Sequence, residues 1–71
     1  MKEIYLGENW SLKKCKNRYM FSEGIHVFIH GDKIEFNSGW LSILNQDGTY
    51  IGSIWINSPG IIKKVKELME E

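Results

Sequence analysis

Two histidines, His26 and His30, are the first residues whose type suggests chemistry, because imidazole is a common zinc ligand. They lie in Ile25–His30, where aliphatic residues occupy every odd position, the period of a half-buried strand. On a strand that rises about 3.3 Å per residue, side chains four residues apart stand about 13 Å from each other. We therefore expect neither a metal nor another cofactor, and interpret both imidazoles as surface groups beside an exposed Phe28.

Nucleophilic catalysis would require a serine or cysteine beside a base that a third group orients. Ser22, Glu23 and His26 are close in sequence, but no nucleophile elbow or glycine-rich phosphate loop surrounds any serine. Cys15 is the only cysteine, so it can form no internal disulfide, and we interpret it as a half-buried thiol. The sequence thus predicts a protein that is not an enzyme, unless an oligomer interface builds a pocket.

A basic segment, residues 13–19, carries four positive charges and ends on an aromatic ring. Such a cluster is typical of contact with nucleic acid or phosphate. Its candidate residues are Lys13, Lys14, Lys16, Arg18 and Tyr19. The alternative is a solvated turn whose lysines keep an edge strand from pairing with another chain. We favour this alternative, because nine basic and nine acidic residues give no net charge to attract nucleic acid.

The last part of the chain has an unusual order of charges, with three lysines preceding three glutamates between residues 63 and 71. The dipole of a helix favours the opposite order. One interpretation is an anion site in which Lys63 or Lys64 joins the free amides at the start of a helix. The other, which we favour, is that pairs four residues apart, such as Lys63 with Glu67, offset the unfavourable order.

Nine aromatic residues are the strongest functional signal in the chain. Strand alternation places Phe28 and Trp55 on the faces opposite their aliphatic neighbours, and we expect Trp40 to join them, with His26 and His30 beside Phe28. Exposed tryptophan and other large rings mark contact surfaces, because such residues dominate binding hot spots. An equally weighted alternative is a second, smaller hydrophobic cluster beneath the N-terminal strands.

Most of the chain is predicted to form short strands. Residues 25–30 and 33–37 are interpreted as a hairpin turned at Gly31-Asp32, and residues 40–44 and 50–56 as a second hairpin turned at Asp47-Gly48. Shorter strands are expected over residues 3–6, 11–15 and 18–21.

The C-terminal segment is predicted to be a helix over about residues 58–70. Ser58 can cap it and Pro59 suits its first position. Its apolar stripe comprises Ile61, Ile62, Val65, Leu68 and Met69. The expected fold class is α+β: a small twisted antiparallel sheet of about five strands in a hairpin meander, with the helix packed on one face.

Length and composition indicate the number of domains, the cellular location and the kind of source. We expect a single domain over residues 1–71, located in the cytoplasm, because no signal peptide or apolar run of about 20 residues is present. Ten isoleucines, eight lysines and no alanine suggest AT-rich coding, as in a low-GC bacterium or its phage. A phage-encoded protein would act in the cytoplasm of the host.

The leading interpretation of function is a non-catalytic binding module that acts through its aromatic sheet face, as a small inhibitor or adaptor of another protein. A chain of this size buries only about 60% of its unfolded surface. Without a disulfide or a metal, we expect a homo-oligomer or a tight partner to supply further stability. The alternative is a protein that binds nucleic acid or a small nucleotide through the Lys13–Tyr19 segment.

Overall fold

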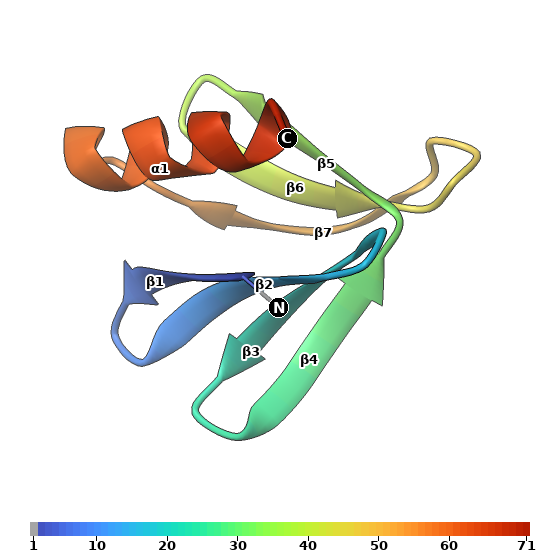
Figure 1. Ribbon diagram of the computed structural model, residues 1–71, viewed down its shortest axis with the longest axis horizontal. Helices are drawn as coiled ribbons and strands as arrows, with labels where there is room; N and C mark the ends of the chain where they lie inside the picture. The colour runs from blue at the N-terminus through green and yellow to red at the C-terminus, as the bar shows by residue number, and fades with distance from the viewer. Residues whose placement is uncertain (1) are drawn as a thin grey trace.

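The computed structural model describes residues 2–71, which form seven β-strands followed by one α-helix (Figure 1). The strands make two antiparallel sheets, one in the order β1-β2-β3-β4 and the other in the order β5-β6-β7. The elements are β1 Lys2–Gly7, β2 Trp10–Cys15, β3 Arg18–Glu23, β4 His26–Gly31, β5 Lys33–Asn37, β6 Trp40–Leu44, β7 Tyr50–Trp55 and α1 Pro59–Met69.

The α+β class, the antiparallel meander and the C-terminal helix are therefore confirmed. The strands number seven rather than about five, and they divide between two sheets. The predicted hairpin of residues 25–37 is wrong, because β4 pairs with β3 while β5 pairs with β6. Only Asp32 separates β4 from β5, and its backbone N–H donates to the Leu44 carbonyl at 2.9 Å. This short link bends the chain from one sheet into the other.

The hairpin of β6 and β7 forms as predicted, with Trp40 opposite Trp55 and Leu44 opposite Tyr50. In its turn Gly48 has a φ of 90°, a value that glycine adopts readily. The Thr49 backbone N–H donates to Asp47 Oδ1 at 2.9 Å. Hydrogen bonds from the side chain and the backbone of Thr49 lower the pKa of the Asp47 carboxyl below its usual range.

The two sheets come closest where β4 ends at Gly31. A Cβ atom on Gly31 would lie 2.6 Å from Ile43 Cγ2 and 2.6 Å from the Leu44 carbonyl oxygen. In β7, a Cβ atom on Gly52 would lie 2.7 Å from Ile29 Cδ1. Because neither glycine has a side chain, β4 can pass directly against β6 and β7. Figure 1 shows the two layers converging near the β4–β5 link and diverging toward the other end of the strands.

The core lies between the sheets and beneath the helix. Leu12 and Phe21 face each other across β2 and β3, with Ile4 and Ile29 completing their row on the flanking strands. The buried apolar residues are Ile4, Leu12, Phe21, Leu41, Ile43, Ile56, Val65 and Leu68. Both sheets and the helix therefore contribute to one cluster.

Helix α1 packs against the edge strand β1 rather than across the middle of one sheet face. Lys66 Nζ lies 5.9 Å from the centre of the Phe36 ring, which belongs to β5, the outer strand of the second sheet. The helix thus closes the side of the molecule where β1 and β5 are edges. Ser58 precedes it without a side-chain capping hydrogen bond, although its carbonyl accepts from the Ile62 N–H at 2.9 Å. No helix within residues 2–71 is long and apolar enough to span a membrane.

The reversed charges of the helix are offset by the first sheet. Lys2 forms an ion pair with Glu71, and Lys14 and Lys16 line the same surface hollow. The three ion pairs within the described residues do not include the predicted pair of Lys63 with Glu67. The acidic end of the helix is therefore matched by lysines that are distant in sequence, which the helix pattern alone cannot reveal.

The close approach at Gly31 predicts a difference between two glycine-to-alanine substitutions. Gly31→Ala should lower the free energy of unfolding by about 2 kcal/mol, because the Leu44 carbonyl is backbone and cannot easily move aside. Gly60→Ala, in the first turn of the helix, where the added Cβ would meet no atom of the other described elements within 4 Å, should raise it by about 0.5 kcal/mol. Urea titration measures both values, and a Gly31→Ala protein as stable as the wild type would contradict the sheet contact.

Candidate functional site

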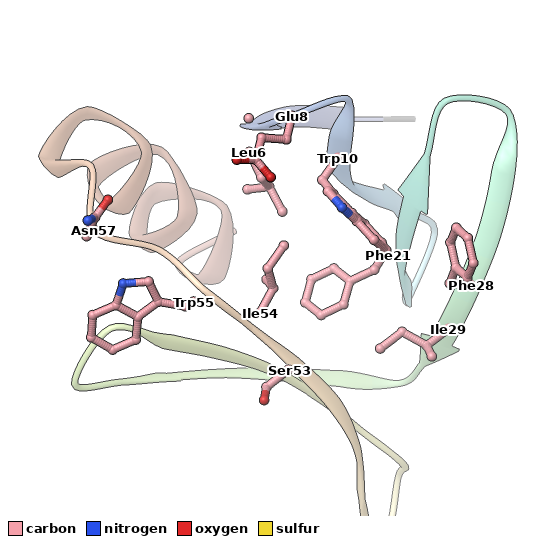
Figure 2. Close-up of a pocket in the computed structure, with 11 residues that line it drawn as sticks. Leu6, Glu8, Trp10, Phe21, Phe28, Ile29, Ser53, Ile54, Trp55 and Asn57 are labelled. Atoms are coloured by element: carbon pink, nitrogen blue, oxygen red, sulfur yellow. The ribbon is translucent and has the colours of Figure 1, made fainter.

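A cleft of about 600 Å³ opens between the sheets at the end away from Gly31. Its lining comes from the β1–β2 turn, from β3 and β4, and from the last part of β7. Figure 2 shows Trp10 and Phe28 on one side, Trp55 on the other, and Phe21 and Ile54 between them. A volume of this size is within the range of pockets that hold small ligands or side chains.

The first wall of the cleft is the pair of Trp10 and Phe28. Their ring centres lie 5.2 Å apart and their planes are tilted by 42°, which is a favourable aromatic contact. Trp10 alternates with Leu12 along β2, so it faces the same side of the sheet as the core. Phe28 remains 57% exposed although it contacts Trp10. The contact between Trp10 and Phe28 therefore leaves part of the aromatic surface of this wall exposed to solvent.

A β-bulge in β4 gives Phe28 this position. Phe21 pairs with Ile29, but the next residue of β3 pairs with Val27, so Phe28 is an extra residue in the strand. Phe28 consequently contacts Trp10 on the core side of the sheet, so the expectation that Phe28 lies on the face opposite Ile29 is wrong. The residues expected to point inward beside them are instead exposed, Val27 by 50% and Ile25 by 92%. The bulge changes the alternation on which that expectation depended.

Trp55 lies at the opposite rim of the cleft and is paired with Trp40 across β6 and β7. The two ring centres are 5.2 Å apart in an edge-to-face arrangement of 66°. Both residues lie on the face opposite Leu41 and Ile54, and they are 49% exposed at Trp40 and 53% at Trp55. Phe28 therefore does not share a sheet face with the two tryptophans, although Phe28 and Trp55 line the same cleft. Their role as partner-binding residues stays a prediction.

The two histidines lie at different places on β4. The His26 ring centre is 6.4 Å from that of Phe28, at the edge of the first wall. The Arg18 guanidinium donates to His30 Nδ1 at 2.6 Å. His26 pairs with Glu23 and His30 pairs with Met20, and the bulge between these pairs puts the two imidazoles on opposite faces of the sheet. Within residues 2–71, no group of three or more histidine, cysteine, aspartate or glutamate side chains could hold a metal ion.

The basic segment does not form one free cationic patch. Lys13 pairs with Glu3 at 3.8 Å, and Lys14 Nζ lies 5.5 Å from the centre of the Tyr19 ring. Arg18 contacts Asp32 at 3.7 Å in addition to its bond with His30. These contacts favour the interpretation of the basic segment as a solvated turn whose charged side chains contact other side chains of the same chain.

Three other predicted positions lie away from the cleft. Cys15 is exposed at the end of β2, so the expectation of a half-buried thiol is wrong. Lys63 and Lys64 are exposed on α1 and border different surface hollows. Residues of β1 contribute to the hollow beside Lys64, whereas the hollow beside Lys63 is lined by helix residues. They therefore do not extend the basic segment.

The charged side chains around the cleft are acidic. Glu8 is the only ionisable side chain among the described residues that line it. The segments that form its walls are residues 6–10, 21–29 and 53–57, and these contain no lysine or arginine. Glu23, the cross-strand partner of Trp10, adds a second carboxylate nearby. The cleft thus combines aromatic rings with negative charge in a chain of zero net charge.

No motif in the sequence marks Glu8, Trp10 or Phe21 as site residues. The alternation of Trp10 with Leu12 could have placed Trp10 on the core side of β2. The cleft itself depends on the divergence of two sheets, which no local pattern encodes. Comparison of the chain with known protein families, curated proteins and solved structures finds no match.

The positions of the histidines generate a prediction about metal content. Purified protein should contain no stoichiometric zinc, and excess EDTA should leave the thermal midpoint unchanged, because His26 and His30 face opposite sides of the sheet. Elemental analysis and a melting curve measure the two quantities. About one zinc per chain, lost together with stability on chelation, would contradict this interpretation.

Proposed function

We propose that this protein is a non-catalytic binding module that engages another protein through its aromatic cleft. The observation that carries the proposal is the exposed aromatic wall of Trp10 and Phe28, with Trp55 at the opposite rim of the cleft. Exposed rings at a concave site are the usual anchors of a protein interface. The module would act as an inhibitor or adaptor by occupying a surface of its partner.

The rings are available because the core is complete without them. Each of Phe28, Trp40 and Trp55 exposes about half of its surface, whereas the residues of the core cluster are buried. Exposed large apolar groups lower solubility, so the exposure of Phe28 and Trp55 at the cleft, with Trp40 beside Trp55, supports a binding role. Their truncation should therefore affect binding more than folding.

The polar groups of the cleft support binding rather than catalysis. Among the described residues that line it, Glu8 supplies a carboxylate, Ser53 directs its hydroxyl away from the cleft, and no histidine, lysine or cysteine is available as a base or activated nucleophile. The Ser53 hydroxyl is instead within 2.8 Å of the Tyr50 hydroxyl. Nucleophilic catalysis requires a base beside the nucleophile, and this arrangement does not supply one.

Self-association is part of the proposal. The Trp40–Trp55 pair extends the aromatic surface onto the outer face of the second sheet. A two-fold contact would present this pair twice and would add the stability that a small domain otherwise lacks. Binding of nucleic acid is less well supported, because Lys13, Lys14 and Arg18 already contact other side chains of the chain.

Alanine substitutions distinguish a binding cleft from a second core. Phe28→Ala and Trp55→Ala should retain native far-UV circular dichroism but weaken partner binding or self-association by about 2 kcal/mol, as hot-spot truncations do. Tyr5→Ala is the matched control, since Tyr5 is 63% exposed and does not line the cleft. Partner capture and sedimentation equilibrium measure the two kinds of association.

Two outcomes would contradict the proposal. The first is a sharp fall in melting temperature for Phe28→Ala and Trp55→Ala without any change in association, which would mean that these rings are core residues. The second is capture of nuclease-sensitive material that is lost steeply as salt increases, which would favour nucleic-acid binding instead.

A further inference from the structure

The walls of the cleft suit a cation for two independent reasons. The face of an aromatic ring carries negative electrostatic potential and attracts a cation, with tryptophan the most effective side chain. Glu8 lines the same cleft and Glu23 lies across from Trp10, with no lysine or arginine in the segments that form the walls. A cation would therefore gain from the rings and from the carboxylates together, whereas an anion would meet repulsion.

The form of the cleft suits a segment of protein chain. Strand β7 borders the cleft with its last residues and is the outer strand of its sheet, hydrogen-bonded only to β6. An extended segment can lie beside such an edge and direct alternate side chains into a neighbouring pocket. The cleft beside Trp10 and Phe28 is then the pocket for one of these side chains.

We propose that the cleft takes an arginine side chain from an extended segment of the partner protein. The cationic group would lie against the Trp10–Phe28 pair with Glu8 as its counter-charge. The inference rests on the proposed function and names the chemistry of the partner. A second copy of this chain is a less suitable donor, because Arg18 is already held by His30 and Asp32.

The test uses two small probes that have the same shape and differ in charge. N-acetylarginine methylamide carries the guanidinium, and N-acetylcitrulline methylamide replaces it with a neutral urea group. Each is titrated into the full chain while the indole N–H signals of Trp10, Trp40 and Trp55 are followed by NMR. The arginine probe should shift the signal of Trp10 more than that of Trp40, which is not among the residues that line the cleft. The citrulline probe should bind about tenfold more weakly.

Three variants separate the contributions of the carboxylate and the ring. Glu8→Gln removes the negative charge but keeps the shape of the side chain, so it should abolish most of the preference for the arginine probe over the citrulline probe. Phe28→Leu should weaken arginine binding while keeping an apolar side chain at the wall, because leucine has no aromatic face. Glu70→Gln is the matched control on the helix, outside the cleft, and should bind like the wild type.

Equal binding of the two probes, or unchanged arginine binding in Glu8→Gln, would overturn the cationic assignment. The proposed function would survive that result if Phe28→Ala and Trp55→Ala still abolished binding of the protein partner. Loss of dimerisation in Glu8→Gln would likewise overturn the assignment to a partner protein, because a second copy would then be the occupant. Failure of both probes to shift any indole signal would exclude a cationic side chain from the cleft.

Discussion

The contact of Gly31 with Ile43 and Leu44 is the constraint on which the rest of this structure depends. It brings β4 against β6 and β7 at a point where one side has no side chain and the other presents a backbone carbonyl. Two twisted sheets that touch at one end must diverge toward the other. The apolar side chains fill the space near the contact, and the cleft remains where the separation exceeds their reach.

The two ends of the chain close one side of the molecule and leave the cleft on another. Helix α1 buries Val65 and Leu68, and the ion pair of Lys2 with Glu71 joins β1 to the end of the helix. The cleft instead receives aromatic residues that only partly cover one another. The candidate site thus lies where the core stops, so its exposed side chains, such as Phe28 and Trp55, can be changed with little effect on packing.

Local patterns in the sequence predict much of this fold. Alternation and turn residues indicated the strand segments, and Pro59 with its apolar stripe indicated the helix. The pattern failed at Gly31-Asp32, which resembles a hairpin turn but bends the chain between sheets. It failed again at the bulge that contains Phe28, because a bulge is defined by pairing with another strand. Trp40 and Trp55 lie on the expected face, whereas the contribution of Trp10 depends on how the two sheets diverge.

The central claim is that the sheets are held together at Gly31 and open at the aromatic walls. A nuclear Overhauser spectrum of the protein in solution tests both parts of this claim at once. We predict strong cross-peaks from the Gly31 α-protons to the Ile43 methyl groups and between the Trp10 and Phe28 rings, with none between Phe28 and Trp55. Strong cross-peaks between the Phe28 and Trp55 rings would contradict the account, because they would mean that the two walls meet and the cleft is closed.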